Sequence, residues 1–471
     1  MLEQFFKLKE NKTNVKTEVL AGVTTFMTMA YILAVNPNLL SASGMDTEAV
    51  FMATAIASFV GTLLMALFSN YPFALAPGMG LNAYFAFTVC GNMGFPWQIA
   101  LVAVFVEGII FIVLSLTNVR EAIFNAIPLT LKHAVSAGIG LFIAFIGLQG
   151  AKIVVNNDST LVTYQHFNEN FRSVGVGAIL ALIGIFITAI LLIRGFKGGI
   201  LFGILFTWLL GILCEVVGIY IPNPDAGMYS VIPDMAWPDL TALGKTAGQV
   251  FKADFSGIKI GDFLTVMFAF LFVDLFDTLG TLIGVASKAD MLDKDGKLPK
   301  IKGALLADSI ATSAGALLGT STTTTFVESA SGVTAGGRTG LTAITTAILF
   351  LVSILFSPIF LAIPSFATCP ALVTVGFYMI GSVAKIHFDD MTEAIPAFLS
   401  IIAMPLTYSI SEGIAIGVIS YTLITIFSGK TKEKKISWLM YVLTILFILK
   451  YIFANTEKIV AFNAMKKTKE L

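Results

Sequence analysis

The chain has 471 residues, of which 56% are hydrophobic and 12% are charged, and its mean hydropathy is +0.88. Soluble domains carry roughly 25% charged residues, so a charged share of about half that value predicts a polytopic membrane protein. The 29 lysines and arginines balance the 29 aspartates and glutamates, which leaves no basic field to bind a nucleic acid.

Seven apolar segments of spanning length fill the first half of the chain. The first follows the charged stretch MLEQFFKLKENKTNVK, and no small-residue cleavage pattern comes after it, so we expect no removable signal peptide. In the third, Pro72 and Pro77 prevent a continuous helix, and Gly78, Gly80 and Asn82 open a second half. The seven lie at about 18–36, 48–69, 71–92, 97–117, 129–150, 173–193 and 198–220.

A polar, proline-rich connection from Ile221 to about Ile260 leads to a second set of seven segments. The tenth segment overall is GTSTTTTFVESASGVTAGGRTG, in which polar, strand-prone residues precede a helix start at about Glu328. A non-helical backbone is tolerated in a bilayer only where protein or water surrounds it. We therefore predict a broken span with its turn at mid-membrane. The second set lies at about 261–286, 302–319, the broken stretch, 340–361, 366–384, 393–409 and 411–428.

The two halves also resemble each other in sequence. Ala53–Leu64 and Ala307–Leu318 share small and apolar residues in the same spacing, and IFNAIP at 123–128 matches IFLAIP at 359–364. Both pairs fall in the same order, which favours an internal duplication. An odd number of spans per half forces the second half to run inverted. The expected fold is an all-α membrane protein of 14 spans in a 7+7 inverted repeat, 1–235 and 255–430, with two short strands in broken spans 3 and 10.

Positive residues indicate the orientation. Lysines precede the first span, and lysines or arginines follow the fourth, sixth, eighth, tenth and fourteenth, which places them all on one side. The positive-inside rule makes that side cytoplasmic, so we expect a multi-pass cell-membrane protein with a cytoplasmic N-terminus. The segment 431–471 is predicted to be cytoplasmic or interfacial. Within it, Trp438–Phe453 is apolar but short and contains Lys450, which favours an interfacial helix over the alternative of a fifteenth crossing.

Acidic residues inside predicted spans are the candidates for function, since each costs about 2.5–3.5 kcal/mol at a helix centre by insertion scales. The eighth span contains Asp274 and Asp277, with Thr281 one turn further on. Hydrogen bonding to a neighbouring helix is the structural alternative for both aspartates. Asp308 in the ninth span stands among hydroxyl residues, and we expect it to hold the broken tenth span in place. Glu107 in the fourth either pairs within the bundle or lines a cavity.

Glu328 stands at the predicted break, where a plain helix N-cap is the alternative to a functional role. Asp277 and Glu328 occur in different spans, and both should face the centre. With nearby hydroxyls such as that of Ser329, they can accept hydrogen bonds from ring N–H groups, and one can carry a proton when buried. This combination suits a neutral, flat solute better than an anion. Phe326 beside the break can stack on an aromatic substrate, although core packing is the default for any phenylalanine.

With these residues in view, the chain resembles the nucleobase:cation symporter-2 family, in its AzgA-like branch of adenine, guanine and hypoxanthine permeases. The resemblance covers nearly the whole chain and implies a core domain of spans one to four and eight to eleven, with the rest as a gate domain. It also implies alternating-access uptake of a purine base with a proton, and often a homodimer. Its motifs are AGVTTFMTMAYILAVNP at 21–37, APGMGLNAYF at 76–85, FDTLGTLIG at 276–284 and TTTFVESASGV at 323–333.

Carried over position by position, the resemblance assigns the substrate to the carboxylates Asp277 and Glu328 and to Asn82 after the third-span break. Phe326 and Ser329 complete the expected binding site. The resemblance also implies a proton-coupling or supporting role for the acidic residue of the ninth span. Thr281 stands where the uracil branch has a histidine, which favours a carboxylate as the proton carrier. The supporting set is thus Asp274, Asp308 and Thr281, and no cofactor or metal is expected.

Two other functions remain alternatives. The same architecture is found in sulfate and bicarbonate carriers, but an anion would favour a cation at the two helix starts, where this chain has carboxylates. An intramembrane aspartyl protease would use paired aspartates in spans, yet Asp274 and Asp277 share one helix and the sequence has no GxGD element. The sequence therefore favours a transporter over an enzyme.

Overall fold

The structure, a computed structural model, describes residues 2–117, 127–166, 170–196, 198–234, 237–288, 291, 298–449 and 451. In this part of the chain, 11 helices are long and apolar enough to cross a membrane. The expected spans missing from that set are the broken third and tenth and the thirteenth, a helix of 17 residues. The count of fourteen stays a prediction. Residues 123–126 of the internal match, together with Arg120, Lys197, Lys294 and Lys297, lie outside the described residues.

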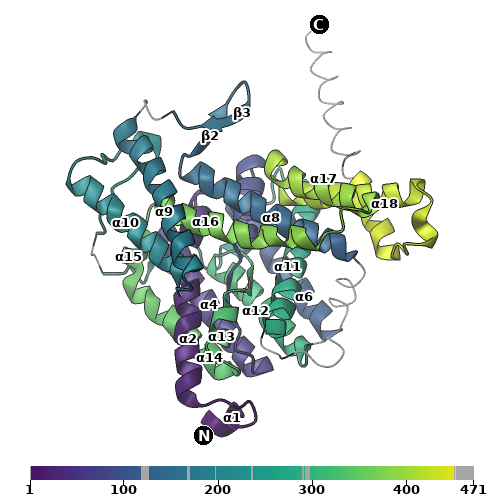
Figure 1. The fold of residues 1–471 in the computed structure, drawn as a ribbon, viewed down its shortest axis with the longest axis horizontal. Helices are drawn as coiled ribbons and strands as arrows, with labels where there is room; N and C mark the ends of the chain where they lie inside the picture. The colour runs from purple at the N-terminus through teal and green to yellow at the C-terminus, as the bar shows by residue number, and fades with distance from the viewer. Residues whose placement is uncertain are drawn as a thin grey trace.

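One helical bundle combines the first four expected spans with the eighth to the eleventh. Within it, α12 packs against α4 and α6, and α14 packs against α2 and α4, so helices far apart in sequence lie side by side (Figure 1). The bundle corresponds to the expected core domain. Its elements are α1 Leu2–Phe5, α2 Val15–Met29, α3 Ile32–Ser41, α4 Thr47–Ser69, β1 Leu75–Pro77, α5 Met79–Ala83, the π-helix η1 Tyr84–Asn92, α6 Trp97–Leu116, α11 Ile260–Lys288, α12 Ile301–Leu318, β4 Thr323–Thr325, α13 Ser329–Thr334, α14 Gly340–Val352, η6 Ser353–Phe356 and α15 Ser357–Leu361.

The second bundle contains the remaining spans and corresponds to the expected gate domain. Here α16 packs along α8, α17 packs against α8 and α18, and α10 packs on α9. In Figure 1 the long helices α8 and α16 run across the view, whereas α2 and α4 of the first bundle run down it. Its elements are α8 Leu129–Gly150, η2 Phe171–Gly175, α9 Val176–Ile193, α10 Gly199–Val216, α16 Ser365–Ile380, η7 Gly381–Lys385, α17 Met391–Thr407, α18 Ile410–Phe427 and η8 Lys430–Lys432.

The connections carry little regular structure. An antiparallel hairpin of β2 Val154–Asn157 and β3 Leu161–Tyr164 follows α8, which the sequence analysis did not foresee. In its described residues, the proline-rich connection contains an isolated β-bridge between Asn223 and Met228 and the short 3-10 turns η3 Pro224–Ala226, η4 Ala242–Lys245 and η5 Gln249–Lys252. It touches the core domain where α12 ends at Gly319, whose φ of 99° suits glycine. A Cβ there would lie 2.2 Å from the Cβ of Thr246, so the close approach also requires glycine.

The helix Trp438–Leu449 lies alongside α18 and runs antiparallel to it. The hydroxyl of Thr444 donates to that of Thr422 at 2.8 Å, and the Tyr451 hydroxyl donates to the carboxylate of Glu412 in the first turn of α18. The contacts follow most of the length of α18. Whether this segment crosses the membrane or lies at its surface stays a prediction.

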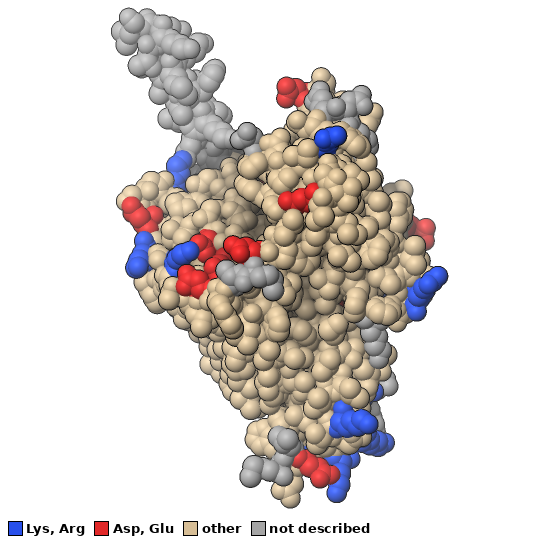
Figure 2. All heavy atoms as spheres, turned by 90° about the vertical axis from the view of Figure 1, so that its left-hand side faces the viewer, with Lys and Arg blue, Asp and Glu red and all other residues tan. Residues whose placement is uncertain are grey.

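The charged side chains are unevenly spread over the surface. On the face shown in Figure 2, lysines and arginines gather at the lower end, where the N-terminus lies in Figure 1, and other charged residues lie on the upper half. An uncharged region separates the two groups. Such a region is what a lipid-facing surface requires, because charged groups are costly in hydrocarbon.

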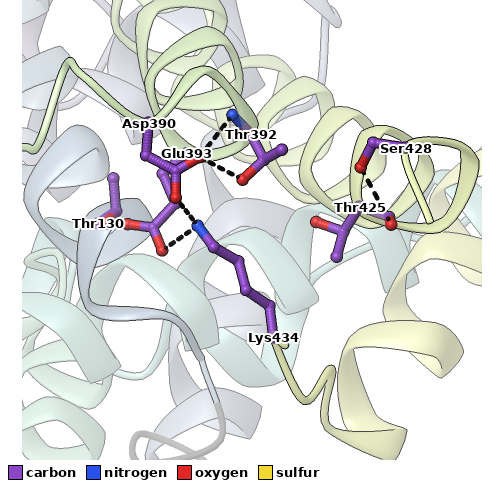
Figure 3. A network of polar contacts seen from close by, with 7 residues as sticks. All are labelled: Thr130, Asp390, Thr392, Glu393, Thr425, Ser428 and Lys434. Carbon is purple, nitrogen blue, oxygen red and sulfur yellow. Dashed lines mark hydrogen bonds and ion pairs between the residues drawn. The ribbon is translucent and has the colours of Figure 1, made fainter. Parts of the chain in front are cut away.

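A polar network joins the chain after α18 to the starts of α17 and α8 (Figure 3). Lys434 donates to the carboxylates of Asp390 and Glu393, the latter at 2.7 Å, and Glu393 also accepts a hydrogen bond from Thr130. Asp390 also caps α17 by accepting from the backbone N–H and the hydroxyl of Thr392. The hydrogen bonds from Lys434 and Thr392 hold the pKa of Asp390 well below its usual range.

We expect Lys434→Met to lower the free energy of unfolding by about 1 kcal/mol at pH 7, because its partners remain partly exposed. A carboxyl group with a lowered folded-state pKa contributes stability above its unfolded pKa of about 3.9 and loses it as the pH falls below that value. Thermal unfolding of the purified protein should therefore separate Lys434→Met from wild type at pH 5–8 and less so below about pH 4. Lys435→Met, at an exposed neighbouring site, is the control, and equal midpoints for the two variants at pH 7 would contradict the prediction.

Candidate functional site

The two broken spans meet inside the core domain. β1 pairs antiparallel with β4, with Ala76 opposite Thr324. Two backbone bonds extend this pairing, from Gly78 N to Thr322 O at 3.0 Å and from Phe326 N to Ala74 O at 3.0 Å. Each strand is followed by a helix start, α5 after β1 and α13 after β4. The prediction of breaks with short strands in spans 3 and 10 is confirmed.

Asp277 lies against the break in the third span. A Cβ added to Gly78 would stand 3.4 Å from Asp277 Oδ2 and 2.8 Å from Thr324 Cγ2, so Asp277 is adjacent to the helix start and glycine here permits the close approach of β4. The Asp277 side chain is partly exposed, whereas Asp274, one turn earlier, is fully buried. The two aspartates on one helix therefore have different surroundings, and Asp277 is the one that faces an accessible space.

Glu328 lies at the other break, close enough to Asp277 for their charges to interact. Its Oε1 accepts a hydrogen bond of 2.7 Å from the hydroxyl of Tyr31, which lies between α2 and α3 in the first span. Glu328 directly precedes α13, yet its side chain makes no capping bond to that helix. The plain N-cap alternative therefore does not describe it. Tyr31 fixes one carboxylate oxygen and leaves Oε2 able to accept from a ligand, and the sequence analysis missed this tyrosine.

Behind Asp277, a buried hydroxyl connects three elements. Thr278 Oγ1 lies 2.7 Å from Asp274 Oδ1, 3.0 Å from Asp308 Oδ1 and 2.7 Å from Thr324 Oγ1, which joins α11, α12 and β4. Thr278 has a single hydroxyl proton and can donate to only one carboxylate. A second full hydrogen bond to this hydroxyl would need a proton on one of the two aspartates. Asp308 is thus linked through Thr278 to the strand of the broken span, and its supporting role stays a prediction.

The remaining predicted residues differ in their surroundings. Asn82 is fully buried: its amide nitrogen donates to Pro77 O at 3.3 Å, and its Oδ1 has no partner among the described residues. An unpaired buried acceptor is unusual in a folded protein, and it can accept a hydrogen bond from water or a ligand. The Ser329 hydroxyl accepts from Ala74 N at 3.0 Å and so joins the two breaks. Phe326 is buried, and Thr281 is partly exposed one turn after Asp277.

Two further carboxylates bind the segments on either side of the broken tenth span. Glu107 accepts a hydrogen bond of 2.8 Å from the Thr322 hydroxyl just before β4, which agrees with the alternative that it pairs within the bundle. Glu18 is completely buried and accepts five hydrogen bonds at the start of α14. The donors are the N–H of Arg338 at 2.9 Å, the N–H and hydroxyl of Thr339 at 3.2 and 2.9 Å, and the N–H and hydroxyl of Thr342 at 3.2 and 2.6 Å.

Glu18 was not predicted to have a role, because it stands at the first residue of the expected first span, beside a charged stretch where a carboxylate is ordinary. Helix-start amides and hydroxyls are the donors that a carboxylate prefers. The threonine spacing in RTGLT, directly after the tenth span, is the signal that could have revealed its partner. Through Glu18, the first span is anchored to the end of the broken tenth span.

Comparison with known proteins agrees with this architecture. A family model described as the permease family, which represents the nucleobase:cation symporter-2 transporters, matches residues 16–416. The chain is 46% identical to the guanine/hypoxanthine permease PbuO of Bacillus subtilis (strain 168), with 94% of this chain and 99% of PbuO covered. It is 41% identical to the adenine permease AdeP of Escherichia coli (strain K12), with 97% of each chain covered.

Among solved structures, the transmembrane domain of the cyanobacterial bicarbonate transporter BicA is similar in fold. The TM-score is 0.62 at 18% sequence identity, with 86% of this chain and 97% of that domain covered. At that identity the likeness concerns the fold alone. It shows that this fold occurs in a transporter of known structure.

Proposed function

Because the chain belongs to the nucleobase:cation symporter-2 family, we propose that it is a secondary transporter that takes up purine nucleobases with a proton by alternating access. The expected substrates are guanine and hypoxanthine, the compounds named for the PbuO relative, and adenine, the compound named for AdeP. The protein would lie in the cell membrane with a cytoplasmic N-terminus, and a homodimer is the assembly expected of it.

The observation that carries this proposal is the pair of accessible carboxylates at the junction of the two breaks. Asp277 lies against Gly78 at the start of one half-helix, and Glu328 directly precedes the other. A carboxylate accepts hydrogen bonds and donates none. This pair would therefore accept hydrogen bonds from the ring N–H groups of a planar base. The partnerless oxygen of Asn82 adds one more acceptor near the same break.

The buried contacts of Thr278 support proton coupling. Its hydroxyl lies between Asp274 and Asp308, and its third contact, Thr324, belongs to the strand that precedes Glu328. A proton held on either aspartate would stabilise that strand by hydrogen bonding. The affinity for a substrate bound at the break would then depend on whether the proton is present.

The alternatives from the sequence are less well supported. In the described part of the chain, no ion pair places a lysine or arginine on Asp277 or Glu328, so the centre does not offer an anion the cation that it favours. For an aspartyl protease, Asp274 would have to share the accessible space with Asp277, but it is buried in the Thr278 network. Both observations favour an uncharged solute that is carried rather than cleaved.

Uptake in cells that lack their own purine permeases tests the proposal. We expect radiolabelled hypoxanthine to accumulate against its gradient, unlabelled guanine or hypoxanthine to compete, and a protonophore to abolish accumulation. Sulfate and bicarbonate should not compete. No uptake of any of the three purines would contradict the function, whereas uptake that survives the protonophore but requires sodium would contradict only the proton coupling.

A further inference from the structure

A second hollow lies between the core and gate domains, away from the two carboxylates. It has a volume of about 240 Å³ and is lined by α3, η1, α8 and α16, by Lys152 after α8 and by Tyr408 after α17. An adjoining hollow of about 460 Å³ extends under β2 and shares Gln149, Lys152 and Tyr408 with the first. The positive-inside rule places the N-terminus on the cytoplasmic side. Lys152 follows the fifth span, and an odd number of crossings would bring these hollows to the outer side.

The two domains contact each other at this outer hollow. The Thr88 hydroxyl in η1 donates to Tyr408 O at 2.9 Å, and the rings of Phe87 and Tyr408 meet edge to face at 6.0 Å. Phe87 and Tyr408 also line the hollow, whereas Asp277 and Glu328 do not. A solute that arrives from this side meets the outer hollow first.

The polar groups of the hollow differ from those of the carboxylate site. The Lys152 ammonium and the Gln149 amide both line the two hollows, and neither side chain has a hydrogen-bond or ion-pair partner among the described residues. The Asn38 amide is already engaged, because it donates to Ile363 O at 3.3 Å and accepts from the Ser365 hydroxyl at 3.2 Å. The free donors are therefore an ammonium and an amide, beside the aromatic residues Phe87 and Tyr408.

These donors match one edge of a 6-oxopurine. The O6 and N7 atoms of guanine are adjacent acceptors that lysine recognises, whereas adenine presents an acceptor and a donor at the same edge. A hollow of 240 Å³ is slightly below the usual size of a drug-binding pocket, which starts at about 300 Å³, so it suits a ligand of one or two rings.

We propose that this hollow is an outer, first-contact site for 6-oxopurines. Lys152 donates to the O6 and N7 edge, Gln149 supplies a second hydrogen bond, and the ring of Tyr408 or Phe87 covers a face of the base. The inference rests on the proposed purine transport and adds a second binding site to it. The outer site offers hydrogen-bond donors and the inner site offers acceptors. The two sites would therefore bind different edges of the same base.

Lys152→Gly is the sharpest test, because Lys152 has a φ of 57°, just past the end of α8, where glycine is the usual residue. The change removes the ammonium without straining the backbone. We expect the KM for hypoxanthine uptake to rise about tenfold at unchanged maximal rate, the cost of one such base contact, and the KM for adenine to change by less than about threefold. Lys12→Gly, an exposed lysine with a φ of 53°, is the matched control and should leave both values unchanged.

Direct binding separates the two sites. In lipid nanodiscs, the full chain carrying Glu328→Gln should retain weak binding of radiolabelled hypoxanthine, and adding Lys152→Gly or Gln149→Leu should weaken that binding about tenfold. An unchanged KM in Lys152→Gly, or no residual binding in Glu328→Gln, would overturn the outer site while purine transport by the wild type stood. Absence of all purine uptake by the wild type would instead overturn the proposed function.

Discussion

Asp277→Asn and Glu328→Gln should each reduce purine uptake about a hundredfold while the protein still reaches the membrane. Each amide keeps the shape of the side chain but places an N–H₂ donor where a ring N–H must be accepted. Loss of one partner of a buried, charged hydrogen bond costs about 2–5 kcal/mol, and 2.8 kcal/mol corresponds to a hundredfold. Initial rates of hypoxanthine uptake, normalised to protein in the membrane by immunoblot, measure the effect.

A matched control lies on the same helix as Asp277. Asp262 is an exposed residue in the first turn of α11, and Asp262→Asn removes an identical charge far from the break, so we expect uptake within about twofold of wild type. Normal uptake by both Asp277→Asn and Glu328→Gln would exclude the carboxylate pair as the substrate site.

Glu18→Ala should be the most destabilising single substitution considered for this chain. The five hydrogen bonds to the buried carboxylate would be lost together, and the freed N–H groups of Arg338, Thr339 and Thr342 would stay buried without their acceptor. Removing one partner from a buried charged network costs about 3–5 kcal/mol. Thermal unfolding of the purified protein, with the amount that reaches the membrane, measures the loss.

The control for Glu18 is a glutamate in the same N-terminal region. Glu10 pairs with Lys7 at the surface, and its side chain is 68% exposed, so Glu10→Ala should change the free energy of unfolding by less than about 1 kcal/mol. Glu18→Gln keeps one acceptor oxygen and should fall between the two. A Glu18→Ala protein as stable as Glu10→Ala would show that the network does not hold the first span to the tenth.

The broken spans and their carboxylates could be predicted from the sequence because polar residues stand out in apolar surroundings. Asp277 interrupts a span, and Glu328 follows a threonine run, so each is visible without knowledge of the fold. Asn82 was identified through its place after two prolines. In each case the energetic cost of the residue in a membrane is itself the signal.

The partners of these residues could not be predicted in the same way. Tyr31 lies in an apolar run where a tyrosine is unremarkable, yet it is 297 positions from Glu328 in sequence and bonded to it in space. Thr278 acquires its role only when α11, α12 and β4 pack together. The predicted substrate contacts of Ser329 and Phe326 stay predictions, and the Ser329 hydroxyl is already bonded to Ala74.

The pairing of β1 with β4 limits how the protein can move. The two half-helix starts are tied by backbone bonds on both flanks of the strands, from Gly78 to Thr322 and from Phe326 to Ala74, so neither can swing away without breaking several of them. A base bound between the two breaks would therefore move together with the core domain as that domain shifts along the gate domain. The interface between the two domains includes the hydrogen bond from Thr88 to Tyr408 O and the ring contact of Phe87 with Tyr408. Both contacts would have to break and be replaced by others during each transport cycle.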